Sequence, residues 1–218
     1  MASGHEILVD HLSLRLRNED ILQNIQMRFA SGHIYGLVGR NGSGKSMLMK
    51  CISGFIHATS GRVLYDGRIV GEDVDFLPDM GVIIETPGFI SCYSGFKNLK
   101  LLAGLKGNIG RPEIQSAMEA VGLDPDAKKT VGAYSLGMRQ RLGIAQAIME
   151  EPDVLILDEP FNGLDTEGVH QIRELIKSYN SENHIIILAS HIEEDIRMLC
   201  DTVLTMEKGT LKSVTSPQ

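Results

Sequence analysis

Four glycines within the nine residues from Gly36 to Gly44 constrain this chain more than any other feature of its sequence. Glycine weakens regular structure, so such a cluster indicates positive φ angles or a backbone that must approach another group closely. An apolar, β-branched run, HIYGLVG, leads into the glycines, and SMLMKCISGF, which can form a helix, follows them. The sequence therefore predicts a strand, a glycine loop and a helix in immediate succession.

This loop matches the phosphate-binding pattern of two spaced glycines followed by lysine and a hydroxyl residue. We expect loop amides and the helix N-terminus to surround nucleotide phosphates, with Lys45 adding a point charge and Ser46 offering an oxygen to Mg²⁺. The alternative is a glycine-rich turn, but a chance match in a chain of this length is on the order of one in a hundred. The predicted nucleotide-binding residues are Gly39, Arg40, Asn41, Gly42, Ser43, Gly44, Lys45, Ser46 and Met47.

Length and composition are those of an ordinary globular chain: 218 residues, of which 43% are hydrophobic and 22% charged, fit one domain or a domain with an inserted subdomain. The formal net charge of -7 argues against nucleic acid as a bulk electrostatic partner. Cys51, Cys92 and Cys200 lack metal-ligand spacing, and we expect reduced, packed thiols. No apolar run approaches the roughly 20 residues that span a bilayer, and the N-terminus lacks a secretory pattern, so we expect a cytosolic protein.

Hydrophobic periodicity divides the chain into parts. Alternation over 6–29 indicates half-buried antiparallel strands, SGRVLYDGRIV a hairpin strand, and MGVIIETPGF a buried strand stopped by Pro87 and Gly88. From 96 to 150 the pattern is helical, and SLGMRQRLGIAQAIME begins on a capping serine. DVLILDEP and HIIILAS are continuous apolar runs, typical of central parallel strands. We predict an α/β nucleotide-binding core with a β subdomain, made of 1–87 and 151–218 and interrupted by a helical insertion at 88–150.

Adjacent acids, Asp158 and Glu159, stand at the carboxyl end of the run VLILD, where open α/β sheets place their ligand chemistry. Asp158 can hold Mg²⁺ through water, while Glu159 can polarise the water that attacks the terminal phosphate. The alternative is a pair of acids in an ordinary strand-to-loop turn. That alternative loses weight beside a phosphate loop, because nucleotide-bound Mg²⁺ needs a carboxylate partner.

In order along nearly the whole chain, these motifs resemble those of the ATP-binding subunit of ATP-binding cassette (ABC) transporters. GRNGSGKS is similar to the family's phosphate loop, YSLGMRQR to its signature segment, LILDEP to its acidic strand, FNGLD to its D-loop and SH at 190–191 to its switch histidine. The resemblance implies a P-loop NTPase (RecA-like) core with an N-terminal antiparallel β subdomain and an inserted α-helical subdomain. It also implies ATP and Mg²⁺ as cofactors, and a homodimer or heterodimer of ATPase subunits with two nucleotides sandwiched between them.

The resemblance assigns roles to residues of this chain. Glu159 and His191 would be catalytic, Asp165 would communicate across the dimer through the D-loop, and Mg²⁺ would be met by Ser46, Glu85 and Asp158. The signature residues that would contact the other subunit's ATP are Ser135, Leu136, Gly137 and Met138. Each assignment has a plainer alternative: Ser135 and Asp165 as simple helix caps, Glu85 as a polar strand terminus, and His191 as a packed or surface histidine.

Several positions depart from the family pattern. Glu85 stands where many members have glutamine, and its extra negative charge would bind Mg²⁺ more strongly while repelling phosphate. Met47 replaces the usual threonine, Leu136 replaces a glycine, and Met138 stands where glutamine is common. We expect signature function to survive through Ser135 and Gly137, and backbone contacts to the phosphates to remain.

The segment that usually supplies an adenine-stacking aromatic offers only Leu16, flanked by Arg15 and Arg17. An arginine plane could replace the ring by stacking, although a solvated surface arginine is the commoner outcome. Weak adenine binding is the expectation that follows.

The chain is similar to the subgroup associated with export of, or self-protection against, peptide antibiotics such as bacitracin and lantibiotics. The segments that carry this resemblance are Glu85 with TPGF, YSLGMRQRLGIAQAI and NGLD. The leading hypothesis is a transport ATPase, peripheral on the inner face of the cell membrane, whose ATP-driven dimer closure powers a separate membrane subunit. The rival is a soluble cassette ATPase acting on a non-membrane partner, which no coiled-coil heptad, zinc cysteine set or basic stripe supports. A phosphoryl-transfer kinase would share the phosphate loop but leave the signature and D-loop unexplained.

Overall fold

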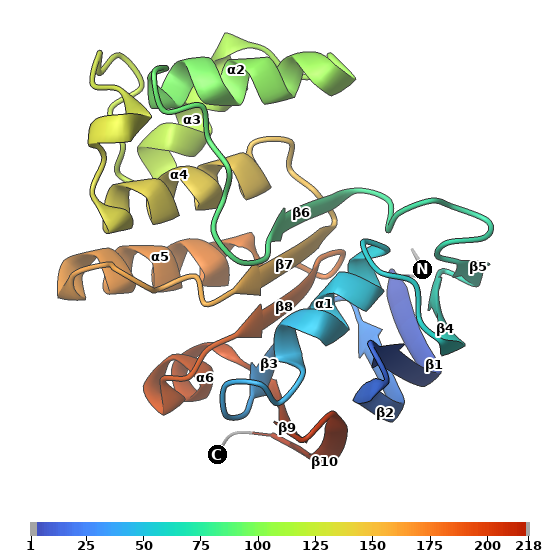
Figure 1. Ribbon diagram of the computed structural model, residues 1–218. Coiled ribbons are helices and arrows are strands. Elements are labelled where there is room, and N and C mark those ends of the chain that lie inside the picture. The colour runs from blue at the N-terminus through green and yellow to red at the C-terminus, as the bar shows by residue number, and fades with distance from the viewer. Residues whose placement is uncertain (1–3, 217–218) are drawn as a thin grey trace.

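A six-stranded sheet with strand order β10-β9-β3-β8-β7-β6 runs through the middle of the molecule (Figure 1). The computed structural model describes residues 4–216. All neighbours pair in parallel except β10, which is antiparallel to β9. The strands are β3 (His33–Val38), β6 (Met80–Ile83), β7 (Val154–Asp158), β8 (Ile185–Ala189), β9 (Thr202–Glu207) and β10 (Thr210–Thr215). Every residue of β7 and β8 is buried, so the prediction of central parallel strands is confirmed.

A second, antiparallel sheet with strand order β2-β1-β4-β5 lies beside the first. Its strands are β1 (Glu6–Leu16), β2 (Glu19–Ala30), β4 (Ser60–Tyr65) and β5 (Arg68–Ile69). Val9 of β1 pairs with Met27 on one side and Val63 on the other, and the apolar positions that alternate in the sequence are the buried ones. The predicted antiparallel strands and the predicted hairpin are both confirmed.

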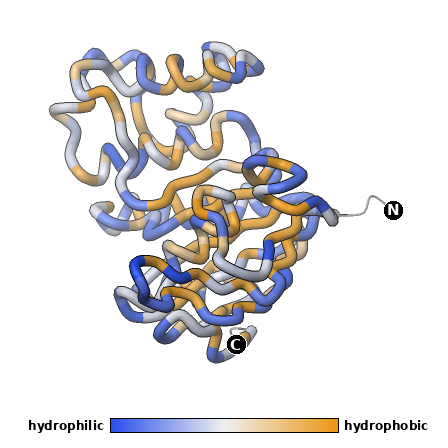
Figure 2. The backbone as a smooth tube through the Cα atoms, turned by 45° about the vertical axis from the view of Figure 1, so that its right-hand side comes forward, coloured by the Kyte–Doolittle hydropathy of each residue, from blue (hydrophilic) through white to orange (hydrophobic). Residues whose placement is uncertain are grey.

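The six-stranded sheet separates two hydrophobic cores. Ile185 and Ile187 face the core shared with the antiparallel sheet and α1, whereas Ile186 and Leu188 face the core shared with the remaining helices. Both faces are therefore covered, which explains why these strands are apolar without alternation. Helices α1 (Lys45–Ser53), α5 (Thr166–Tyr179) and α6 (Glu193–Leu199) contribute to these cores, and α4 (Leu136–Ile148) packs against β6. In Figure 2 the strands inside the molecule carry long hydrophobic stretches, while many peripheral turns are hydrophilic.

Between β6 and β7 the chain forms a helical layer, drawn at the top of Figure 1. It contains α2 (Gly95–Lys106), α3 (Arg111–Ala120), a 3₁₀ turn (Val131–Ala133) and α4 (Leu136–Ile148). Leu142, Ala145 and Ile148 lie on the buried face of α4, as their helical spacing predicted. Among residues 4–216, no helix is both long and apolar enough to cross a bilayer.

Two expectations from the sequence are wrong in detail. Strand β6 ends at Ile83, so Glu85 does not end a buried strand but lies in an exposed bend, with a φ of 65°. β6 is the edge strand of the sheet, and its pairing ends at Ile83 although β7 continues to Asp158, because the chain leaves the extended conformation in the bend at Glu85. The thiols of Cys51 and Cys200 are buried as expected, but Cys92 is exposed in the segment before α2.

Candidate nucleotide site

The glycine loop leaves β3 at the carboxyl edge of the central sheet and ends where α1 begins at Lys45. Gly42 and Gly44 have φ angles of 80° and 107°, in the left-handed region that favours glycine. A Cβ atom at Gly39 would clash with the Met206 backbone carbonyl oxygen, so there is no room for a side chain there. Both requirements inferred from the glycine cluster, positive φ and close approach, are thus met in this loop.

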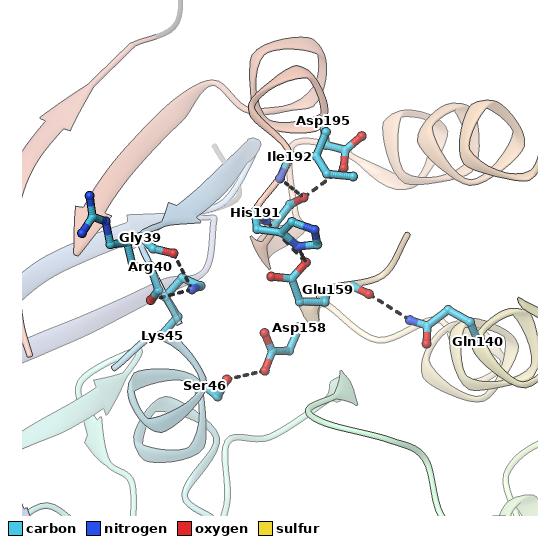
Figure 3. Close-up of polar contacts among 11 residues, drawn as sticks. Gly39, Arg40, Lys45, Ser46, Gln140, Asp158, Glu159, His191, Ile192 and Asp195 are labelled. Carbon is cyan, nitrogen blue, oxygen red and sulfur yellow. Dashed lines mark hydrogen bonds and ion pairs between the residues drawn. The ribbon is translucent and has the colours of Figure 1, made fainter. Parts of the chain in front are cut away.

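Lys45 is 7% exposed and folds back over the loop, as Figure 3 shows. Its Nζ donates to the Gly39 carbonyl at 2.8 Å and to the Arg40 carbonyl at 3.5 Å. In the same loop the Ser43 hydroxyl is buried and has no hydrogen-bond partner among the described residues. A buried, unsatisfied hydroxyl costs about 1–3 kcal/mol. An oxygen-rich anion bound in this loop would satisfy it, so the loop fits a phosphate group.

Ser46 and Asp158 meet across the site, with Ser46 Oγ donating to Asp158 Oδ2 at 2.5 Å. Burial raises the pKa of the Asp158 carboxyl, and the charge of Glu159 raises it further, whereas the Ser46 hydrogen bond and Lys45 lower it. A hydroxyl and a carboxylate are ligands that Mg²⁺ accepts, and this ion usually takes few protein ligands beside water and phosphate oxygens. The pair therefore fits the predicted metal position.

Glu159 contacts His191, with His191 Nδ1 lying 2.7 Å from Glu159 Oε2 (Figure 3). The Glu159 backbone has a φ of 51°, which non-glycine residues rarely adopt, and strain of this kind clusters at functional sites. Its amide donates to the Ala189 carbonyl at 2.9 Å, and its carbonyl accepts from Gln140 Nε2 at 3.2 Å. The strained turn is thus held from both the central sheet and the helical layer.

Glu85 forms an ion pair with Lys50 of α1 instead of contacting Ser46 or Asp158. The Glu85 side chain is 67% exposed and that of Lys50 is 21% exposed. Even so, Glu85 lines one pocket together with Asp158 and Glu159, and its charge contributes to the raised pKa of Asp158. The negative charge of Glu85 therefore lies close to Asp158 and Glu159 but is paired with Lys50.

The signature residues lie at the start of α4, where Leu136 lines the same pocket as Glu85, Asp158 and Glu159. Within the described part of the chain, none of them lines the two pockets formed by residues of the phosphate loop. Ser135 caps the helix, its Oγ accepting from the Met138 amide at 3.1 Å, and Leu136 is 62% exposed. Asp165 caps α5 through a 2.9 Å bond from the Gly168 amide. Both predicted capping roles are confirmed. A role of Ser135 towards a nucleotide held by another subunit stays a prediction.

Sequence reasoning missed three residues around the loop. Ile21 lines the pocket formed by residues 41–47, Asp158 and Glu159, while Asn162 lines the neighbouring pocket with His191. Gln140 reaches the site from α4, although it precedes Glu159 by 19 positions in the chain. Ile21 gave no signal beyond strand alternation. Gln140 is a buried polar residue inside an apolar helix face, and that pattern could have pointed to it.

Comparison with known proteins gives matches over nearly the whole chain. The family model "ABC transporter" matches residues 22–162. The chain is 39% identical over 213 residues to the bacitracin transport ATP-binding protein BcrA of Enterococcus faecalis, covering 97% of this chain and 69% of that protein. It is 36% identical over 203 residues to the lantibiotic transport ATP-binding protein SrtF of Streptococcus pyogenes, covering 93% and 87%.

Among solved structures, the dimeric post-hydrolysis state of the ATP-binding cassette MJ0796, bound to ADP and Pi, superimposes with a TM-score of 0.86. The match covers 97% of this chain and 99% of that one at 18% identity. At this identity the likeness concerns the fold, and it confirms the predicted α/β architecture with its added antiparallel sheet.

Proposed function

This chain belongs to the ABC transporter family, and from that premise we propose that it is the ATP-hydrolysing subunit of an exporter, powering a separate membrane subunit. As a family member it binds ATP and hydrolyses it to ADP and phosphate. Two contacts beside the phosphate loop carry the assignment to particular residues: Ser46 with Asp158, and Glu159 with His191. A hydroxyl–carboxylate pair suited to Mg²⁺ and an acid–histidine pair beside one loop support this assignment.

Each side chain then has a distinct role. Lys45 binds the β- and γ-phosphates, exchanging its carbonyl partners for phosphate oxygens, and the amides of residues 39–47 hold the phosphates in place. Ser46 and Asp158, with Glu85 nearby, would hold Mg²⁺, which would neutralise phosphate charge. Glu159 accepts a proton from the attacking water, and His191 orients Glu159 and the terminal phosphate.

We propose that two such subunits close on two ATP molecules. The N-terminus of α4 presents Ser135 and free helix amides that form an anion site. A second subunit would supply the phosphate, and Leu136, Gly137, Met138 and Asp165 would lie at the same contact. Closure would pass through the helical segment 88–150, which we propose as a subdomain.

We further propose that the subunit acts on the inner face of the cell membrane and that the exported compounds are peptide antibiotics. The support is the likeness to BcrA and SrtF, whose names refer to bacitracin and lantibiotic transport. Expression with a candidate membrane subunit from the same organism, followed by detergent extraction and affinity purification, tests the partnership. Recovery of the ATPase without a membrane protein, and equal antibiotic sensitivity of cells with and without the pair, would contradict the proposal.

The catalytic assignment is tested by Glu159→Gln. Replacing the carboxylate removes the proton acceptor, so ATP hydrolysis should fall by about 100-fold or more while ATP binding persists. The matched control is Glu174→Gln on α5, whose exposed carboxylate contacts Lys177 and lies outside the pockets described above. Steady-state ATPase assays and fluorescent-nucleotide titrations measure the two quantities. Wild-type turnover by Glu159→Gln would give Glu159 another role.

A further inference from the structure

A buried ion pair joins α5 to α6 behind the switch histidine. Arg173 Nε donates to Asp195 Oδ1 at 3.0 Å, and Arg173 Nη2 contacts the same oxygen. The Asp195 side chain is completely buried and that of Arg173 is 11% exposed. Burying two charges is costly, and replacing such a pair by apolar residues is often neutral or stabilising. The pair therefore calls for an explanation beyond stability.

The second carboxylate oxygen of Asp195 holds the turn between β8 and α6. Ser190 Oγ donates to Asp195 Oδ2 at 2.9 Å and accepts from the Ile192 amide at 3.1 Å. Ser190 and Ile192 are the residues on either side of His191, and Figure 3 shows Ile192 and Asp195 next to it. The chain Arg173, Asp195, Ser190 thus fixes the backbone both before and after the histidine.

His191 itself has little packing to hold it, since its side chain is 57% exposed. Its imidazole nevertheless lies 2.7 Å from Glu159. The orientation of an exposed ring depends mainly on the backbone to which it is attached. The reaction rate falls steeply when a catalytic group is displaced from its productive position. The hydrogen bonds of Ser190 to Asp195 and to the Ile192 amide therefore hold the backbone that orients the His191 side chain.

We propose that Arg173 and Asp195 are positioning residues for ATP hydrolysis, acting through Ser190 on His191. The inference rests on the proposed roles of Glu159 and His191. Arg173 orients the Asp195 carboxylate, one oxygen of which remains directed at the Ser190 hydroxyl, and that hydroxyl holds the turn. None of the three side chains needs to touch ATP, so nucleotide binding is independent of them.

The simpler alternative is that the network only fastens α5 to α6. Two sets of variants separate the alternatives. Ser190→Ala removes the link to the turn but leaves the ion pair, and Ser190→Thr restores a hydroxyl. Arg173→Met combined with Asp195→Leu replaces the ion pair by apolar groups, which preserves helix packing but leaves Ser190 without its acceptor.

For Ser190→Ala we expect kcat to fall by about ten-fold, with KM and the nucleotide Kd within about two-fold of wild type. Ser190→Thr should recover kcat to within about two-fold of wild type. The Arg173→Met/Asp195→Leu variant should melt near the wild-type temperature and show the same loss of kcat, and adding Ser190→Ala to it should cost little more. Glu194→Gln is the control, because Glu194 is an exposed neighbour of Arg173, 3.6 Å from Nη1, and should leave kcat unchanged.

Wild-type kcat in Ser190→Ala overturns the inference, and so does failure of Ser190→Thr to recover activity. If the apolar double variant does not fold, the two Ser190 variants still decide the question. His191→Ala and Glu159→Gln, assayed in parallel, test the underlying assignment. If those two retain full turnover, the proposed site is wrong. If they lose turnover while Ser190→Ala keeps it, only the positioning role is wrong.

Discussion

The ion pair between Lys50 and Glu85 predicts a measurable coupling in nucleotide binding. Glu85 adds a negative charge near Asp158, and the charge already contributes to the raised pKa of that carboxyl. Lys50 sits against Glu85 and offsets this charge. Lys50→Gln should therefore expose the phosphates of a bound nucleotide to the uncompensated Glu85, whereas in a Glu85→Gln background the same substitution should matter little.

The size of the coupling follows from exposure. Because Glu85 is 67% exposed and Lys50 21%, solvent screens the pair, and about 0.5 to 1 kcal/mol is expected. That energy corresponds to about a two- to five-fold increase in the Kd for MgATP on Lys50→Gln, and to less than about 1.5-fold when Glu85→Gln is already present. Raising the ionic strength should shrink the difference, since screened charges interact more weakly.

The assay measures the nucleotide Kd by fluorescent-nucleotide titration. It compares the wild type, both single variants and the double variant at low and high salt, with free Mg²⁺ held constant. Additive effects of the two substitutions would refute the reasoning, because independent residues show no coupling in such a cycle. A coupling that did not change with salt would also contradict it. Thermal melting of all four forms without nucleotide controls for damage to α1.

Other parts of the structure give further predictions. Lys45→Ala should weaken ATP binding by about ten-fold or more, since hydrogen bonds to charged groups contribute about 1.5–3 kcal/mol; unchanged affinity by calorimetry would contradict this. Mixing Lys45→Ala subunits with Ser135→Arg subunits should recover ATPase activity, because one site of a mixed dimer is then intact; mixed dimers without activity would count against the shared site. Burial raises the pKa of Cys51 to about 11 and that of Cys200 to about 12, so both are neutral thiols near pH 8. Of the three cysteines, only the exposed Cys92 should therefore react quickly with a thiol reagent, and timed labelling followed by mass spectrometry measures this.

Local patterns made much of the fold predictable from the sequence. The glycine loop, the capping roles of Ser135 and Asp165, and the apolar runs that became β7 and β8 each depend on residues close together in the chain. Such features have a direct signature, because a cap, a turn or a doubly covered strand restricts which residue types can stand at a given position. The order of these signatures then identified the architecture.

What the sequence did not reveal depends on pairing between distant segments. The run VIIE continues the apolar pattern, but β6 stops pairing at Ile83 although β7 continues to Asp158. The chain leaves the extended conformation at Glu85, whose φ is 65°, and apolar periodicity gives no signal for such a bend. Nothing in the pattern IEED distinguishes Asp195 from a surface acid, and only the packing of α5 against α6 reveals that it is buried with Arg173. A charged residue gives no periodic signal that tells a solvated position from a paired, buried one.

The place of β3 in the central sheet determines when during synthesis the nucleotide site can form. This strand carries the phosphate loop, yet its two neighbours are β8 and β9, from the far end of the chain. His33 pairs with Ile185, so the phosphate loop and the acids at the carboxyl end of β7 have no common sheet until β8 has emerged from the ribosome. Long-range parallel pairing of this kind is slow, and its unpaired strands are prone to aggregate. Nascent chains ending before β8 should therefore fail to bind ATP although every residue of the phosphate loop is already present.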